Sequence, residues 1–183
     1  MTKVEKPLLI IEGPQGSGKT TVATFMSTKG FTLVRGIPLA EQLIKNREYQ
    51  NWHEASKIAQ ECIRLGNGVV LDRCLWSLVA FNMRVRSGYE DLVYRLGISR
   101  FQRCIGSGSY LLIILQAPPS LCMERNINDK TPLTLYRYQD YEQEVGIYQK
   151  LHQKLVSDGI NTRTIDNIGT KDFLYKQVLG LLV

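Results

Sequence analysis

The sequence lacks long hydrophobic runs and closely paired cysteines. Its longest apolar run, Tyr110 to Leu115, is far shorter than the roughly 20 residues of a membrane-spanning helix, so no membrane partner is expected. No secretory signal is apparent, because the first apolar run leads directly into a glycine-rich loop. Without C-x-x-C spacing a zinc site is not expected, and a cytoplasmic protein with reduced, mostly buried thiols is favoured. The cysteines are Cys62, Cys74, Cys104 and Cys122.

The chain also has no run of like charge, no internal repeat and no low-complexity linker. Lys and Arg number 23 against 17 Asp and Glu, a net charge of +6, but the basic residues are scattered. This distribution suits a small anionic partner such as a nucleotide, and nucleic acid is not expected to be the main partner. With 44% hydrophobic residues among 183, residues 1–183 are expected to form one globular domain.

Strand and helix patterns alternate along the chain. Predicted strands cover residues 8–11, 31–35, 69–73, 110–116 and 162–165. Helical spacing covers the residues up to about 28, then 39–46, 52–65, 75–86, 90–104, a segment from 120, 135–157 and a segment from 171. This alternation is typical of an α/β protein, in which helices cover both faces of a five-stranded parallel sheet.

The stretch GPQGSGKT, from Gly13 to Thr20, fits the phosphate-loop pattern G-x-x-x-x-G-K-[ST]. It follows the apolar strand PLLIIE and opens a helix, which is the setting that this pattern requires. Backbone N–H groups of such a loop face a polyphosphate, and the helix adds its positive N-terminal end. Lys19 is expected to reach the β- and γ-phosphates, and Thr20 to bind Mg²⁺. The nucleotide-binding residues of this segment are predicted to be Gly13, Gln15, Gly16, Ser17, Gly18, Lys19, Thr20 and Thr21.

Charged residues end three of the predicted strands. Asp72 and Arg73 follow the apolar VVL, and the carboxyl ends of parallel strands meet at one edge of a sheet. Asp72 is therefore predicted to join Thr20 as a metal ligand, while Arg73 binds a phosphate. Glu12 is among the candidates for the substrate site, where it either orients the metal's waters or only caps the loop. Arg35 either meets an acceptor phosphate or ends its strand in solvent.

A polar segment, NINDKTP, follows the predicted helix from 120 and suggests a mobile lid at about residues 125–137. Arg125, Lys130 and Arg137 bracket this segment. Cations on a closing loop would exclude water and stabilise charge during transfer of a phosphoryl group. Arg125 is the preferred candidate for this role, and at least one of the three is expected to be a solvated surface residue.

Three further residues are candidates for binding an acceptor. Trp52, at a helix start, either stacks on an acceptor base or packs in the core. Ser77 and Asn82 lie about one helical turn apart beyond Arg73, and Asn82 would hydrogen-bond a base or sugar. Phe81 on the same helix is equally well explained as a core residue.

Together these motifs resemble the thymidylate kinase and deoxynucleoside kinase branch of the P-loop kinases. The resemblance rests on IIEGPQGSGKTT, on VVLDRCLWSLVAFN, which is similar to the family's D-R-Y-x-x-S-x-x-A-Y segment, on LQAPPSLCMERN and on TIDNIG. It implies a three-layer P-loop NTPase fold with strand order 2-3-1-4-5, and transfer of the γ-phosphoryl of ATP with Mg²⁺. By position it implies catalytic roles for Lys19, Asp72, Arg73 and Arg125, adenine contacts near Asn167 to Thr170, and a possible homodimer.

The chain departs from the family at the end of the second strand. Thymidylate kinases often have R-E-P there, and deoxynucleoside kinases have a Glu-Pro whose Glu acts as base on the 5′-hydroxyl. Here the run is RGIP, with Arg35 kept and Gly36 in place of the Glu. A phosphate acceptor is already a nucleophile at neutral pH, whereas a hydroxyl benefits from a base. The helix before Asp72 also lacks the Arg that the family aims at thymine.

The leading hypothesis is therefore an ATP-dependent kinase of a (deoxy)nucleoside monophosphate such as dTMP. The first alternative is a deoxynucleoside kinase that uses Glu12, Asp72 or Glu41 as base. A second alternative is a kinase of nucleic-acid 5′-ends, which the basic charge weakly allows. A non-catalytic nucleotide-binding module is the alternative of a different class.

Overall fold

We analysed a computed structural model of the chain. It describes residues 6–36, 48–65, 68–106, 108–128 and 137–182. The predicted helix at 39–46 and Glu41 lie outside these residues. So does the middle of the predicted lid with Lys130, and the lid stays a prediction.

The core of the fold is a five-stranded sheet in the order β2-β3-β1-β4-β5. All of its strand pairs are parallel, which confirms the predicted fold class and strand order. The strands are β1 (Leu8–Glu12), β2 (Thr32–Arg35), β3 (Val69–Asp72), β4 (Tyr110–Gln116) and β5 (Thr162–Asp166). In this register Asp72 lies between Ile11 of β1 and Arg35 of β2. The strand-ending residues therefore share one edge of the sheet.

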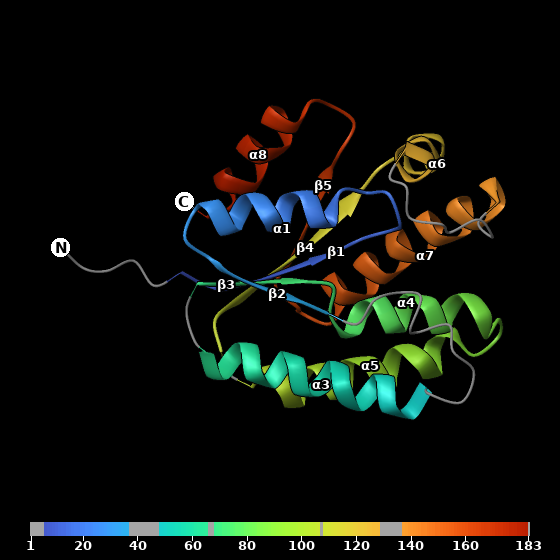
Figure 1. The fold of residues 1–183 in the computed structure, drawn as a ribbon. Helices are drawn as coiled ribbons and strands as arrows, with labels where there is room; N and C mark the ends of the chain where they lie inside the picture. The colour runs from blue at the N-terminus through green and yellow to red at the C-terminus, as the bar shows by residue number, and fades with distance from the viewer. Residues whose placement is uncertain (1–5, 37–47, 66–67, 107, 129–136, 183) are drawn as a thin grey trace.

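Helices cover both faces of the sheet, as Figure 1 shows. On one face lie α1 (Lys19–Thr28) and α8 (Lys171–Gly180). On the other lie α3 (Glu48–Leu65), α4 (Leu75–Val85), α5 (Glu90–Ile105) and α7 (Tyr138–Ser157), and α6 (Pro119–Asn128) packs on α7. This two-sided cover explains why β1 and β3 are buried along their whole length and apolar up to their last residues, Glu12 and Asp72.

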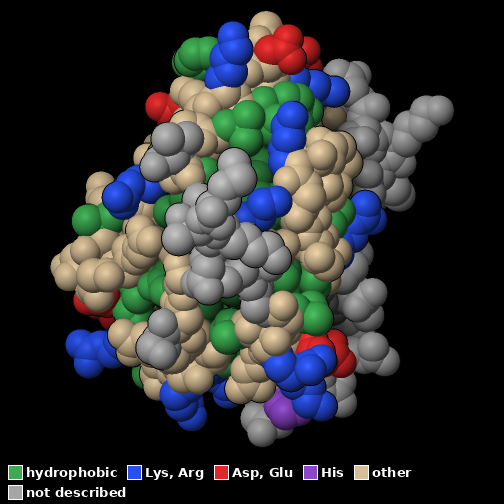
Figure 2. All heavy atoms as spheres, turned by 90° about the vertical axis from the view of Figure 1, so that its left-hand side faces the viewer, with side chains coloured by type: hydrophobic (Ala, Val, Ile, Leu, Met, Phe, Trp, Pro, Cys, Tyr) green, Lys and Arg blue, Asp and Glu red, His purple; other side chains and the backbone are tan. Residues whose placement is uncertain are grey.

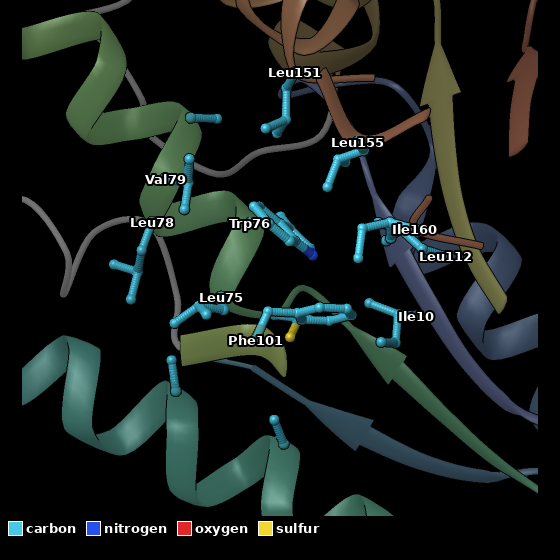
Figure 3. Close-up of a cluster of buried hydrophobic side chains, with 14 of the residues drawn as sticks. Ile10, Leu75, Trp76, Leu78, Val79, Phe101, Leu112, Leu151, Leu155 and Ile160 are labelled. Atoms are coloured by element: carbon cyan, nitrogen blue, oxygen red, sulfur yellow. The ribbon is translucent and has the colours of Figure 1, made fainter. Parts of the chain in front are cut away.

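The larger of two hydrophobic cores lies between the sheet and the α3, α4, α5 and α7 layer. Trp76 of α4 is fully buried there and packs on Phe101 of α5, with 5.0 Å between the ring centroids. Figure 3 shows both rings between α4 and side chains of the sheet and α7, among them Ile10 and Leu155. Burial of two large aromatic residues holds α4 and α5 together against the sheet. This packing positions the start of α4 at the carboxyl edge of the strands.

The surface at the opposite edge, where the strands begin, carries scattered basic side chains. Figure 2 shows this face, with Lys and Arg in separate places and hydrophobic side chains between them. No helix among the described residues is long and apolar enough to cross a membrane.

Candidate active site

The phosphate loop joins β1 to α1 and is packed tightly against two other elements. A Cβ atom added at Gly13 would lie 2.3 Å from the carbonyl oxygen of Leu115 at the end of β4. One added at Gly16 would lie 2.2 Å from the carbonyl oxygen of Cys122 in α6. Both glycines also have positive φ angles, 143° and 77°. The loop glycines are thus required by backbone conformation and by close packing at once.

Lys19 is buried at the start of α1, with 3% of its surface exposed. Its Nζ donates to the carbonyl oxygens of Gly13 and Pro14, at 2.7 and 2.6 Å. Burial, followed by repulsion from Arg73, lowers the pKa of Lys19 to about 7, although nearby carboxylates oppose this shift. Lys19, which is predicted to bind phosphate, therefore donates to its own loop, and its ammonium group loses its charge near neutral pH.

Glu12, at the end of β1, is fully buried below this loop. Its carboxylate accepts from the backbone N–H groups of Cys74 and Ser77, at 2.6 and 3.1 Å, and from the Ser77 hydroxyl. Burial raises the pKa of Glu12 to about 7. Its oxygens are engaged with the start of α4, so the structure favours the structural role over the predicted contact with substrate.

A cavity of about 400 Å³ opens beside the phosphate loop and α1. This volume is within the range of small-molecule sites. The cavity brings together residues from the loop, from the end of β3, from α6 and from the segment between β5 and α8. Its lining residues are Gln15, Gly16, Gly18, Lys19, Thr20, Thr21, Arg73, Arg125, Asn126, Asn167, Gly169, Lys171 and Leu174.

Asn167 connects three of these elements. Its Nδ2 donates to the carbonyl oxygen of Ser17 at 2.8 Å, and Arg125 donates to the Asn167 carbonyl oxygen at 3.2 Å. A Cβ atom at Gly18 would lie 2.6 Å from the Asn167 amide nitrogen, so this contact also needs a glycine in the loop. Arg125 and Asn167, predicted from separate motifs, meet at the same cavity.

Arg73 is held toward the loop from the other side. Its backbone has φ = 72°, a left-handed conformation that non-glycine residues seldom adopt. Its guanidinium donates to Gln15 Oε1 at 2.6 Å, and Gln15 Nε2 donates to Asn126 Oδ1 at 3.4 Å. Asn126 in turn donates to the Tyr141 hydroxyl at 2.7 Å. A chain of hydrogen bonds therefore runs from Arg73 through the loop to α6 and α7.

The predicted metal ligands fit a magnesium ion that takes most of its ligands from phosphates and water. Thr20 is exposed at the cavity wall. Asp72 is 5% exposed, and its Oδ1 has no hydrogen-bond partner among the described residues, as expected of an oxygen that faces an ordered ion or its water. The described part of the chain holds no group of three or more His, Cys, Asp or Glu side chains suited to a metal.

A second, much smaller cavity of about 10 Å³ lies between α4 and α7. Glu144 borders it, and burial raises the pKa of this carboxyl group. The sequence analysis identified neither Glu144 nor Arg84 as a candidate. They belong to two helices far apart in sequence, and no local motif marks them. The lining residues are Arg73, Ser77, Ala80, Phe81, Arg84, Glu144 and Tyr148.

Besides Glu12, three predicted substrate-binding residues line neither cavity. The Asn82 amide is buried and donates to the Leu78 carbonyl oxygen of its own helix at 3.0 Å, and its contact with an acceptor stays a prediction. Trp52 is 8% exposed in the larger core, with the Arg100 guanidinium 5.3 Å from its ring, which favours its packing role. Arg35 ends β2 as an exposed residue, and its contact with an acceptor phosphate stays a prediction.

Several solved structures share this architecture over nearly the whole chain. Deoxyadenosine kinase from M. mycoides with bound dATP superposes with a TM-score of 0.73 at 18% identity, covering 96% of this chain and 98% of that one. The chain has the fold of the P-loop nucleotide kinases. Thymidylate kinase from Candida albicans gives 0.62 at 17% identity, with coverages of 98% and 92%. The YorR protein from Bacillus subtilis, in complex with phosphorylated GDP, gives 0.65 at 18% identity, with coverages of 95% and 94%.

At these identities the likeness shows the fold and leaves the substrate open. No protein-family model matches the sequence, and no curated protein matches it. The geometry of the two cavities therefore carries the functional argument.

Proposed function

We propose that the protein transfers the γ-phosphoryl group of ATP to a nucleoside monophosphate, with dTMP as the leading acceptor. The larger cavity would hold the donor, with its phosphates in the loop and its adenine near Asn167 and Gly169. Bound Mg²⁺ would neutralise phosphate charge between Thr20 and Asp72. Lys19 would donate to the β- and γ-phosphates, and Arg125 would bind the transferring group from the side of α6.

The observation that carries the choice of acceptor is the crowding at Gly36. A Cβ atom there would lie 2.2 Å from the Arg73 carbonyl oxygen and 2.9 Å from the Arg73 carbonyl carbon. The Gly36 N–H also donates to the Asp72 carbonyl oxygen at 2.8 Å. No side chain fits at the position where a deoxynucleoside kinase would carry its base. A phosphate acceptor does not need that base.

Two other carboxylates near the loop, those of Glu12 and Asp72, do not replace this base well. Glu12 is fully buried and engaged with α4, so it has no access to a hydroxyl group. Asp72 is the predicted ligand of the metal. Arg73 borders both cavities, so it would bind the acceptor phosphate on one side of the loop while the donor occupies the other. This arrangement favours a monophosphate acceptor over a nucleoside.

Coupled-enzyme assays of ATP consumption with the four deoxynucleoside monophosphates and the four deoxynucleosides test this proposal. Turnover is expected with at least dTMP and is expected to be lost in Lys19→Ala, while Arg95→Gln on the exposed side of α5 should behave as the parent. Phosphorylation of nucleosides alone would establish the alternative acceptor. Full biological activity of a Lys19→Ala protein that no longer binds ATP would favour the non-catalytic module.

A further inference from the structure

The side chain of Gln15 joins the phosphate loop to two other elements. Its Oε1 accepts a hydrogen bond from the Arg73 guanidinium at 2.6 Å, and its Nε2 donates to Asn126 Oδ1 at 3.4 Å. Both ends of the amide are therefore engaged, one just after β3 and the other in α6. The backbone N–H groups of such a loop suffice to bind phosphate, so the side chain is available for a separate role.

The donors and acceptors along this chain of hydrogen bonds fix the orientation of both amides. A guanidinium group only donates, so Arg73 requires the oxygen of the Gln15 amide and leaves its NH₂ group to face α6. The Asn126 amide then accepts with its oxygen and donates to the Tyr141 hydroxyl at 2.7 Å. Asn126 and Tyr141 are both buried, and a buried polar group is costly to leave unpaired. Burial thus holds the far end of the chain in one arrangement.

The backbone of Gln15 is held from α7. Its N–H donates to the carboxylate of Glu144, which lies three residues beyond Tyr141 and therefore on the same face of α7. The cations that interact electrostatically with this carboxylate are Lys19, Arg73 and Arg84. The backbone and the side chain of Gln15 are thus fixed together by one helix face.

One face of α6 supports the loop at two neighbouring residues. Cys122 and Asn126 occupy positions i and i+4 of this helix, so they lie on the same face. A Cβ atom at Gly16 would lie 2.2 Å from the Cys122 carbonyl oxygen, while Asn126 accepts from Gln15. Gln15 therefore has a fixed frame against which Arg73 can be oriented.

Arg73 depends on this frame for its orientation. Within the described ranges, Gln15 is the hydrogen-bond partner that the structure gives to the Arg73 guanidinium. A long side chain without such a partner has many rotamers, and ordering it when a ligand binds costs affinity. The bond to Gln15 uses one of the guanidinium N–H groups, and the others stay available for bidentate contact with a phosphate.

We propose that Gln15 is a positioning residue that orients Arg73 in advance for the acceptor phosphate. This inference rests on the proposed function, in which Arg73 binds that phosphate. Orientation before binding removes part of the entropic cost of ordering the arginine. The Gln15 side chain thus serves the acceptor, although its backbone belongs to the loop that is proposed to hold the donor.

Gln15→Met keeps the length of the side chain and removes both of its hydrogen bonds. We expect it to raise the Kd and KM for dTMP on the order of 10-fold, with kcat and the Kd for a non-hydrolysable ATP analogue unchanged. In an Arg73→Ala background, Gln15→Met should weaken dTMP binding no further, because it acts through Arg73. Gln102→Met on the exposed side of α5 is the matched control and should behave as the parent.

NMR of the nucleotide-free protein with isotope-labelled arginine provides a readout that needs no acceptor. A hydrogen bond slows rotation of the guanidinium group, so the Arg73 N–H signals, identified by their absence from Arg73→Ala, should be resolved in the parent. They should be averaged in Gln15→Met and unchanged in Gln102→Met.

Three results would overturn the positioning role. These are Arg73 signals that are averaged in the parent or do not respond to Gln15→Met, dTMP affinity that Gln15→Met leaves unchanged, and equal losses of that affinity with and without Arg73. Failure to bind or phosphorylate any nucleoside monophosphate, with the Arg73 signals still dependent on Gln15, would instead refute the proposed function. The orientation of Arg73 by Gln15 would then still stand.

Discussion

Burial sets the protonation of two charged side chains at the phosphate loop. Lys19 and Glu12 both have pKa values of about 7, the first lowered and the second raised, chiefly by burial. Lys19 donates to two carbonyl oxygens of the loop, while Glu12 accepts from the start of α4. A phosphate that enters the loop would favour the charged ammonium form of Lys19. The protonation of this lysine is thus coupled to occupancy of the site.

We expect ATP binding above pH 7 to take up a proton at Lys19. The bound phosphates raise its pKa above the value of about 7 in the empty loop, so between the two values binding requires protonation and affinity falls as pH rises. Calorimetry at pH 8 in buffers of different ionisation enthalpy should detect uptake approaching ~1 proton. Lys19→Arg stays protonated throughout and serves as the control. Equal uptake by both proteins would refute the assignment to Lys19.

At the scale of secondary structure, the junction between β3 and α4 carries much of the site. It supplies Asp72 and Arg73, and Glu12 holds its helical side through Cys74 N–H. The left-handed φ of Arg73 turns its carbonyl group toward Gly36 at the end of β2. The backbone segments that follow β2 and β3 therefore pack closely against each other at the edge where the acceptor phosphate is proposed to bind.

Gly36→Ala should destabilise the protein by about 1–3 kcal/mol, because its methyl group would overlap the Arg73 carbonyl oxygen. We also expect a raised KM for the acceptor, since Arg73 must shift. Gly146→Ala in α7 is the matched control: nothing lies within 4 Å of its added Cβ, and alanine favours a helix by up to about 1 kcal/mol. Urea unfolding and acceptor kinetics of both variants would check this. Equal stabilities would contradict the predicted overlap.

For the whole molecule, the sequence predicts the fold well. Each of the five strands was expected within a residue or two, and the larger cavity is lined by loop residues together with Arg73, Arg125 and Asn167, whose roles in binding stay predictions. These residues follow local patterns, either a motif or a strand end. The second cavity, between α4 and α7, follows none, because its lining residues come together only when two helices that are distant in sequence pack.

The position of Asn82 away from the second cavity has a simple geometric cause. Asn82 is five residues beyond Ser77, which places it about 140° around the helix from that residue. The cavity-facing stripe continues instead through Phe81 and Arg84.

Nucleotide binding should stabilise the whole domain, because the phosphate loop, the segment after β5 and α6 meet at the larger cavity. A non-hydrolysable ATP analogue with Mg²⁺ at 100 times its Kd is expected to add about 2.7 kcal/mol. For a chain of this size that raises the Tm on the order of 5–10 °C. Thermal melts of the parent should show this rise and those of Lys19→Ala should not. An equal rise in the Tm of both proteins would show that the nucleotide binds away from the phosphate loop.

The contact between Gly36 and the Arg73 carbonyl also limits the routes by which this chain could acquire a hydroxyl acceptor. A glutamate at position 36 would overlap the neighbouring backbone. The single substitution that supplies a base would therefore impair folding before the base could be used. A change at Arg73 that relaxes its left-handed backbone would have to come earlier or at the same time. Directed evolution toward nucleoside substrates should therefore randomise positions 36 and 73 together, because stepwise selection would discard the useful intermediate.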